Sequence, residues 1–280
     1  MDRQSSSAPT ARFSGTRSSS SRSSSSSPPP PPAYPAASLE VLKPYFAGQP
    51  KSLSGIALRA FCLGATLSAS LILTVALLLR GGDTPLWRPS FFLVALSVFH
   101  FLEFWTTAHR NTLVASIDSF LLTANWPSYA VAHTSALLEC LVVGVFFPDR
   151  SWAPRGLAPL MVAAGLTMVV VGQVVRSVAM LQAGASFNHH VQTRKADSHY
   201  LVTSGVYAVL RHPSYFGFFY WGLGTQLVMG NVFCFVAYAV VLWTFFNDRI
   251  AREEVKLVEF FGGEYQMYRE RVGTMIPFIQ

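Results

Sequence analysis

Long apolar segments with almost no charged residues constrain this chain more than any other feature of its sequence. A helix of about 20 apolar residues is long enough to cross the hydrocarbon core of a bilayer. Six segments approach or exceed this length, at about residues 55–79, 89–107, 127–147, 156–181, 213–229 and 232–246. Only 12% of the residues are charged, about half of the usual share in a soluble domain. We therefore predict an all-α integral membrane protein with about six transmembrane helices.

The last two apolar segments are joined by Gly230 and Asn231, a pair that favours a tight turn, so they should form a helical hairpin. Segment 232–246 is near the minimum length of a span, and we expect its helix to continue past the membrane through residues 247–261. These features divide the chain into a tail (1–38), four membrane helices (39–187) and a C-terminal region (188–280).

The N-terminal tail is rich in serine and proline, with serines at 23–27 and prolines at 28–32. Such a stretch cannot bury enough apolar surface to offset the entropy lost on ordering, so we predict a disordered tail. It lacks the apolar core of a secretory signal. Its serine and arginine content also suits an organelle transit peptide, but the amphipathic arginine pattern is weak, which favours a cytosolic tail.

The net charge of +7 raises the possibility of a nucleic-acid partner. The basic residues are scattered and flank the apolar segments, which is the pattern of a protein whose partner is the lipid bilayer, and we predict no nucleic-acid binding. Placing the N-terminus in the cytosol puts most Lys and Arg residues on one side. This topology predicts that both termini, together with a polar passage at residues 188–215, face the cytosol.

Three cysteines, Cys62, Cys140 and Cys234, lie within apolar segments without metal-ligand spacing, and we predict that they fill the core. Four buried polar side chains in the second and third segments have two interpretations. They could seat a metal, or they could form hydrogen bonds between neighbouring helices, which is more common. These residues are His100, Glu103, His133 and Glu139. We predict no metal site, because no established metal-binding motif accompanies them.

The polar passage at residues 188–215 holds four of the seven histidines. Titratable groups gathered in one connection of a membrane protein indicate chemistry there. At the end of the passage, Pro213 favours the start of a helix, whose free N–H groups suit a carboxylate or a phosphate. The alternative is an anchor at the level of the lipid headgroups, formed by Arg211, His212 and Tyr215.

Three charged residues have both a functional and a structural interpretation. Arg249 and Glu253 are four residues apart and share one helix face. They could hold two groups of bound ligands, or they could form a solvated ion pair of little energetic value. Arg176, near the end of the fourth segment, faces either a cavity or partner inside the membrane or extends to the cytosolic interface.

Several motifs in the last hundred residues occur together in one known family. They are FNH at 187–189, LVTSGVY at 201–207, RHPSY at 211–215, EE at 253–254, FFGGEY at 260–265, Tyr268, RV at 271–272 and IPFI at 276–279. In this combination the chain resembles the isoprenylcysteine carboxyl methyltransferase family, from about Ile56 to the C-terminus. The RHPxY motif alone is less specific, because sterol reductases and other small membrane methyltransferases carry related versions.

The resemblance implies methyl transfer from S-adenosylmethionine to the α-carboxylate of a C-terminal S-prenylated cysteine in processed CaaX proteins, such as small GTPases. It implies that Arg249 positions the substrate carboxylate with help from Arg176, and that Glu253 holds the cofactor's ammonium. The residues implied for the cofactor pocket are Gln192, His199, Tyr200, Leu201, Val202, Tyr207, His212, Pro213, Ser214, Tyr215 and Glu253. It also implies residence in the endoplasmic reticulum membrane, with the C-terminal region closing the pocket in the cytosol.

Two alternatives stay open at this point. The first is a sterol-type reductase using NADPH, which shares the RHPxY theme but usually needs more spans and more basic residues. The second is a membrane scaffold or small transporter, although no internal repeat supports the common transporter architectures. All readings depend on whether Tyr215 and Glu253 meet at one end of the helices.

Overall fold

The computed structural model describes residues 36–80, 85–148, 156–195 and 199–280 of the chain. The predicted tail lies outside these ranges except for residues 36–38, which belong to the short helix α1 (Ala36–Leu42). The chain from Val41 to Gln280 forms one compact unit.

Each predicted apolar segment is a helix, and the described residues contain helices, turns and loops but no strand. The long helices are α2 (Leu53–Leu79), α3 (Trp87–Arg110), α4 (Ser128–Phe146), α5 (Leu157–Ala183), α6 (Pro213–Met229) and α7 (Phe233–Phe261). Helix α7 continues to Phe261 as expected, and a short helix α8 (Gly263–Arg271) follows it. Single 3-10 turns lie at η1 (Lys43–Tyr45), η2 (Ile117–Phe120), η3 (Gly184–Ser186) and η4 (Gly205–Ala208). The prediction of an all-α fold is confirmed.

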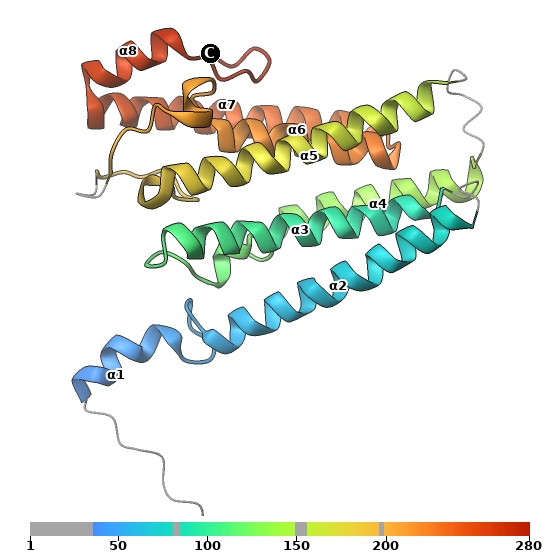
Figure 1. The fold of residues 1–280 in the computed structure, drawn as a ribbon, viewed down its shortest axis with the longest axis horizontal. Coiled ribbons are helices and arrows are strands. Elements are labelled where there is room, and N and C mark those ends of the chain that lie inside the picture. Colours follow the sequence, from blue (N-terminus) through green and yellow to red (C-terminus); the bar gives the residue numbers. More distant parts are fainter. Residues whose placement is uncertain (1–35, 81–84, 149–155, 196–198) are drawn as a thin grey trace, which may run out of the picture. The chain divides into compact units, whose positions relative to one another are not determined.

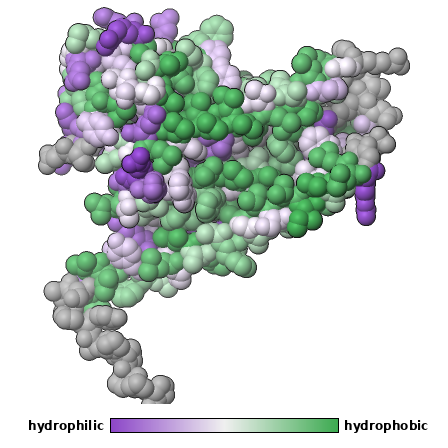
Figure 2. All heavy atoms as spheres, viewed as in Figure 1, coloured by the Kyte–Doolittle hydropathy of each residue, from purple (hydrophilic) through white to green (hydrophobic). Residues whose placement is uncertain are grey.

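Five helices are long and apolar enough to cross a membrane: α2, α3, α4, α5 extended through η3, and α7. Large apolar side chains on them face outward, among them Ile72, Val145 and Phe233. Figure 2 shows that hydrophobic residues cover most of the helical body, while hydrophilic residues gather at the end that carries α8. A soluble protein rarely exposes so much contiguous apolar surface, whereas a bilayer covers it.

Helix α6 differs from these five because it has 17 residues and most of them are buried inside the protein. It lies between α5 and α7 (Figure 1), with α3 and α4 forming the adjacent layer and α2 packed against α3. Successive long helices alternate in direction, so the passage 188–215 and the end of α7 lie at the same end of the bundle (Figure 1). That α6 spans the bilayer stays a prediction.

Four glycines allow α5 and α6 to touch through their backbones. A Cβ built on Gly217 would lie 2.5 Å from the carbonyl oxygen of Gly172, and one on Gly224 would lie 2.7 Å from that of Gly165. The glycines are seven residues apart on each helix, or about two turns, so both pairs lie on one face. Such close approach of small residues is a common basis of helix association in membranes. It fixes α6 firmly against α5.

Glu139 of α4 caps the N-terminus of α7. Its carboxylate accepts hydrogen bonds from the backbone N–H groups of Val232 (2.7 Å), Phe233 (2.9 Å) and Cys234 (2.7 Å). An anion stabilises the positive end of a helix dipole and satisfies N–H groups that lack partners within the helix. This contact holds the α6–α7 hairpin against α4.

The other polar side chains predicted in the second and third segments also form hydrogen bonds. His100 Nδ1 lies 2.7 Å from the Phe120 carbonyl, and His133 Nδ1 lies 3.2 Å from the Tyr238 hydroxyl. The hydrogen-bonding interpretation is therefore the one that the structure shows. Over the described ranges, no three metal-ligating side chains come together.

The prediction that all three cysteines fill the core is wrong for one of them. Cys140 and Cys234 are buried, but Cys62 is exposed on α2. The reason is that α2 packs chiefly against α3, so few of its side chains are buried. An apolar segment alone does not show which of its faces contacts protein.

Candidate active site

Two segments that are distant in the sequence meet at the end of the bundle that carries α8. Tyr215, in the first turn of α6, donates its hydroxyl proton to Glu253 Oε2 on α7. Arg249, one turn before Glu253, donates from Nε to the Tyr215 oxygen at 2.8 Å. The meeting of Tyr215 and Glu253, on which the sequence predictions depend, is confirmed.

The local sequence explains how these side chains reach one another. His212 is the N-cap of α6 and Pro213 occupies the first turn, as the proline predicted. Tyr215 is therefore held on the first turn, where its ring stacks on Phe246 of α7 with centroids 5.2 Å apart. The Arg249 guanidinium lies 5.3 Å from the centroid of the same ring, a favourable cation–π distance.

The surface interpretations of Arg249 and Glu253 are wrong. The Tyr215 hydroxyl bridges the two side chains, and Arg249 Nη2 also donates to the carbonyl oxygen of His189. The solvated pairs on this helix are formed by other residues, Arg252 with Asp248 and Lys256 with Glu259, each at 2.7 Å. Arg249 and Glu253 thus face the protein, because helical periodicity turns them toward α6 and the passage.

A cavity of about 100 Å³, which we name the tyrosine cavity, contains all but one of the residues predicted to bind the cofactor. Those that line it are His199, Tyr200, Leu201, Val202, Tyr207, His212, Pro213, Ser214, Tyr215 and Glu253. Other residues that line the cavity were not predicted from the sequence: Ser186, Phe187, Asn188, Arg211, Leu257, Phe261, Tyr265 and Tyr268. Gln192 does not line it: its Nε2 donates to the His190 carbonyl at 3.0 Å and stays within its own loop.

A second cavity of about 200 Å³, the arginine cavity, is lined by both Arg176 and Arg249. Its other walls combine polar groups with aromatic rings: Asn125, Tyr129, His189, His190, Phe218, Phe245 and Phe246. Phe187, Asn188 and Tyr215 line both cavities. The two cavities therefore lie next to each other, with Tyr215 in the wall between them.

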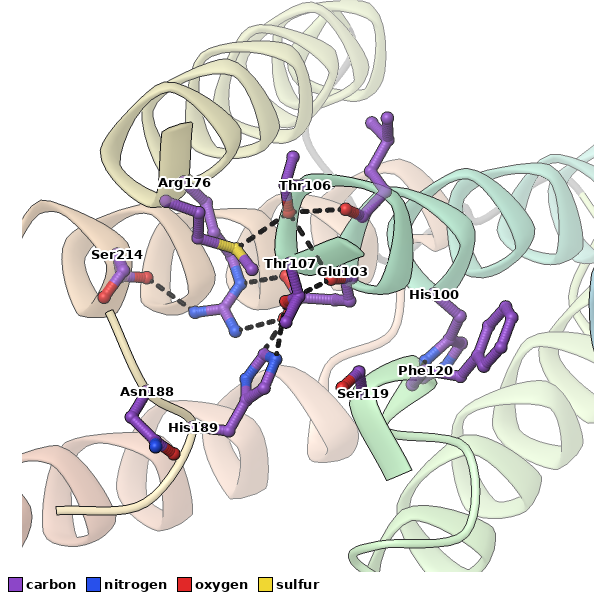
Figure 3. Close-up of polar contacts among 12 residues, drawn as sticks. His100, Glu103, Thr106, Thr107, Ser119, Phe120, Arg176, Asn188, His189 and Ser214 are labelled. Carbon is purple, nitrogen blue, oxygen red and sulfur yellow. Dashed lines mark hydrogen bonds and ion pairs between the residues drawn. The ribbon is translucent and has the colours of Figure 1, made fainter. Parts of the chain in front are cut away.

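Arg176 is buried, with 5% of its surface exposed, so the interpretation in which it extends to the interface is wrong. Its Nε and Nη2 donate to the two carboxylate oxygens of Glu103 on α3, the latter at 2.7 Å, and its Nη1 donates to the Ser214 carbonyl at 2.9 Å. Figure 3 shows this arrangement, with His189 below the pair. A charge this deeply buried needs such a partner, because desolvation is costly.

Like Glu103, Glu254 has a role that the sequence did not indicate. It is 6% exposed and accepts hydrogen bonds from His212 Nε2 at 2.8 Å and from the Tyr265 hydroxyl at 2.7 Å. Arg211 and Arg269 lie within ion-pair distance, at 3.6 and 3.5 Å. Glu254 thus ties the start of α6 to α8, which places Tyr265 and Tyr268 over the tyrosine cavity. The adjacent glutamates were visible in the sequence, but the fold-back of α8 was not.

Burial shifts the pKa values of several titratable groups around the two cavities. It lowers the pKa of His189 to about 4, with Glu103 opposing the change, so this imidazole is neutral at pH 7. Burial also raises the pKa of Tyr268 to about 12 and raises that of Tyr207. These phenols therefore stay protonated and act as hydrogen-bond donors.

Comparisons with known proteins agree with this geometry. Residues 165–259 match the model of the isoprenylcysteine carboxyl methyltransferase (ICMT) family. The protein-S-isoprenylcysteine O-methyltransferase of Saccharomyces cerevisiae is 49% identical over 189 residues, which cover 67% of this chain and 79% of that protein. The protein of the same name from Rattus norvegicus is 42% identical over 229 residues, covering 80% of this chain and 75% of that one.

The chain belongs to the isoprenylcysteine carboxyl methyltransferase family. A solved structure of the eukaryotic intramembrane Ras methyltransferase ICMT superposes with a TM-score of 0.73 and 35% identity, covering 87% of this chain and 82% of that one. Membership makes the chain a membrane-embedded methyltransferase. The alternatives of a sterol-type reductase and of a scaffold or transporter are not favoured. Both arginines and most of the residues that line the tyrosine cavity lie in the region that the ICMT family model matches, whereas part of the arginine cavity is formed by residues 114–129 outside it.

Proposed function

We propose that this protein transfers a methyl group from S-adenosylmethionine to the α-carboxylate of a C-terminal S-prenylated cysteine. The observation that carries the proposal is the Tyr215 hydroxyl, which joins Arg249 of the arginine cavity to Glu253 of the tyrosine cavity. A cation suited to a carboxylate and an anion suited to an ammonium thus face two adjacent cavities. The names of the related proteins supply the reaction, and this geometry is compatible with it.

The donor set of the tyrosine cavity fits S-adenosylmethionine, which supplies an electrophilic methyl group when bound. Glu253 would hold the ammonium of its amino-acid part, as a carboxylate can. Aromatic rings from Tyr200, Tyr207 and Phe261 offer surfaces for an adenine ring. The first turn of α6 lines the same cavity through Pro213, Ser214 and Tyr215, and the positive end of its helix dipole suits a carboxylate. Loops and helix ends build this site in place of the glycine-rich turn after a strand used by soluble nucleotide-binding folds.

The arginine cavity fits the substrate's α-carboxylate. Arg249 has a planar guanidinium that can grip a carboxylate with two N–H groups, and it borders the cavity from α7. Arg176 adds a second positive charge, although two of its nitrogens already donate to Glu103. We propose that Arg249 binds the carboxylate directly and that Arg176 stabilises it electrostatically. Phe218, Phe245 and Phe246 would contact the start of the prenyl chain.

The residues present suit this reaction because the nucleophile needs no activation by a base. A carboxylate oxygen, already anionic, would form a bond to the methyl carbon while the carbon–sulfur bond would break with its electron pair staying on sulfur. The products are a methyl ester and neutral S-adenosylhomocysteine, and no proton moves. The protein's work is to align the two groups and to exclude water from opposite charges that cancel in the transition state. The neutral His189 and the protonated tyrosines are consistent with this role.

We propose that ligands rearrange the walls of the two cavities, because both cavities are small. Both volumes lie below the roughly 300 Å³ at which small-molecule pockets usually begin. The Tyr215–Glu253 and Arg249–Tyr215 contacts join elements that would separate when ligands enter. We propose that ligands exchange these internal contacts for contacts with the ammonium and the carboxylate.

The substrates that we propose are processed CaaX proteins, including small GTPases. We propose the endoplasmic reticulum membrane as the location, with both termini and both cavities facing the cytosol. The distribution of Lys and Arg supports this orientation. The prenyl chain would enter from the bilayer between helices while the peptide approaches from the cytosol.

The function is tested with membranes containing the full chain, methyl-labelled S-adenosylmethionine and N-acetyl-farnesylcysteine. We expect base-labile methyl ester, and we expect S-adenosylhomocysteine to raise the midpoint of thermal unfolding. Membranes without the chain are the control. If no ester forms and S-adenosylhomocysteine leaves thermal unfolding unchanged, the proposed function is wrong.

A further inference from the structure

Three polar residues on α3 face the same loop. Glu103 and Thr107 are four residues apart and lie on one face of the helix, and Asn111 continues this stripe at the helix C-cap. We name these three residues the α3 stripe. All three contact residues 185–189, the stretch that connects α5 to the tyrosine cavity.

The contacts run along the loop in order. Asn111 Nδ2 donates to the Phe187 carbonyl at 3.1 Å. Thr107 Oγ1 lies 3.2 Å from His189 Nε2, and Glu103 Oε2 lies 3.7 Å from His189 Nδ1. The Thr107 hydroxyl donates its one proton to the Glu103 carbonyl at 2.8 Å, so it accepts from Nε2–H of His189. This contact holds the imidazole beside Thr107 (Figure 3).

The loop that the α3 stripe holds is part of the wall between the two cavities. The carbonyl oxygen of His189 accepts a hydrogen bond from Arg249 Nη2, and Phe187 and Asn188 line both cavities. The Glu103 carboxylate also accepts two hydrogen bonds from Arg176. One face of α3 therefore sets the position of both arginines, although α3 itself contributes no residue to the lining of either cavity.

We propose that Glu103 and Thr107 are positioning residues for methyl transfer: Glu103 orients Arg176, and Thr107, through His189, holds the carbonyl that orients Arg249. This inference rests on the proposed function. Glu103 is 1% exposed, and a buried ion pair contributes little to stability compared with an apolar pair of similar volume. Orienting Arg176 toward the arginine cavity is a role for this carboxylate that an apolar residue could not take over.

The chain offers a matched control next to the tested residue. Thr106 is as deeply buried as Thr107, but its hydroxyl bonds to the Leu102 carbonyl at 2.7 Å and to Met180 Sδ at 3.4 Å and not to the loop. Both threonines bond to a carbonyl in the preceding turn. Thr106→Val and Thr107→Val thus remove similar bonds within α3, and only Thr107→Val removes the contact with His189.

The experiment measures ester formation and thermal unfolding of the full chain in liposomes. We expect Thr107→Val to lower kcat about tenfold, because sub-ångström displacement of a positioning group is sufficient for such a loss. Thr106→Val should keep kcat within about twofold, with a similar unfolding midpoint, and Thr107→Ser should restore activity because it keeps the hydroxyl. Glu103→Gln should raise KM for the prenylcysteine about tenfold while the affinity for S-adenosylhomocysteine stays within about threefold.

A double-mutant cycle separates positioning from general destabilisation. If Thr107 acts through the imidazole, Thr107→Val should change kcat less than about twofold in a His189→Ala background, because the contact is already lost. Equal activity of Thr106→Val and Thr107→Val would overturn the inference and leave the proposed function intact. The same holds if the activity losses of Thr107→Val and His189→Ala multiply when the two substitutions are combined. Failure of the unmodified chain to form ester would overturn both.

Discussion

Adding one methyl group between α5 and α6 should reveal how closely catalysis depends on their spacing. The Cβ of Ala at position 217 would lie 2.5 Å from the Gly172 carbonyl oxygen and 2.8 Å from the Cβ of Arg176. Ordinary contacts begin at 3.4 Å, so the helices must separate by about 0.9 Å at this point. Overpacking of this kind typically costs about 1–3 kcal/mol of folding free energy.

The position of the clash decides what is lost besides stability. Gly217 lies about one turn from Ser214, whose carbonyl accepts the 2.9 Å bond from Arg176. A separation of about 0.9 Å would lengthen this bond beyond hydrogen-bond range and turn Arg176 away from its present orientation. We expect Gly217→Ala to lower kcat/KM by about 10- to 100-fold.

Gly224→Ala provides the comparison. Its Cβ would lie 2.7 Å from the Gly165 carbonyl oxygen, so the overlap is similar, but the contact is two turns farther from the site. We expect a comparable loss of stability and a change in kcat/KM below about threefold. A Cβ on Gly64 of α2 would meet nothing within 4 Å, so Gly64→Ala should be neutral or slightly stabilising.

The assay combines thermal unfolding in detergent with ester formation in liposomes at a temperature well below every unfolding midpoint. The reasoning is refuted if Gly217→Ala and Gly224→Ala lose activity equally, or if Gly217→Ala retains both wild-type stability and wild-type turnover.

Three further predictions concern single side chains. Arg249→Ala should abolish ester formation without unfolding the protein. Arg249→Lys should also be strongly impaired, because an ammonium cannot bind a carboxylate through two parallel N–H groups. Normal turnover of either variant in the ester assay would exclude the carboxylate-binding role. Glu139→Ala should lower the free energy of unfolding by about 1–3 kcal/mol, because it leaves backbone N–H groups of α7 without partners; thermal unfolding measures this, and an unchanged midpoint would contradict the capping role. His189 has a pKa of about 4 in the folded protein against 6.5 as its ordinary value, so protonation favours the unfolded state and stability should fall as the pH drops from about 6.5 to 4. His189→Gln should reduce this fall, and a pH dependence of unfolding identical to the unmodified chain would show that another group is responsible.

The helix bounds could be predicted closely because their signals are local. The sequence interpretation placed one span at 213–229, and α6 occupies Pro213–Met229, since Pro213 and Gly230 mark its two ends. It also extended the last helix to residue 261, where α7 ends before Gly262. Hydropathy, proline and glycine act within a few residues, so neither result required knowledge of the fold.

The convergence of Tyr215 and Glu253 was predictable for a different reason. Counting spans and charges placed the two segments on one side of the membrane, and the resemblance to a family supplied the roles. Gln192 shows the limit of carrying such roles over, because a residue in a loop can turn its side chain back onto its own backbone.

The Glu103–Arg176 pair could not be predicted because the partners are 73 residues apart and lie on helices that are not consecutive. Periodicity shows that each lies in an apolar helix but does not give the rotation of one helix against another. Their pairing depends on how α3 and α5 are rotated about their axes, which only the packed structure shows. Glu254 escaped prediction for the same reason, since its partners on α8 come from a reversal at Gly262.

The same pair has a consequence for biosynthesis. At about 5–20 residues per second, the ribosome completes Arg176 some seconds after Glu103. During this interval α3 carries a carboxylate without its cation. An acidic residue in a lone helix opposes insertion by up to about 2.5–3.5 kcal/mol at the helix centre, and Glu103 lies about two turns from the C-terminal end of α3, so its cost is smaller. We expect α3 to remain beside the translocon until α5 emerges. Site-specific crosslinking of stalled nascent chains would show this retention, and Glu103→Leu should shorten it.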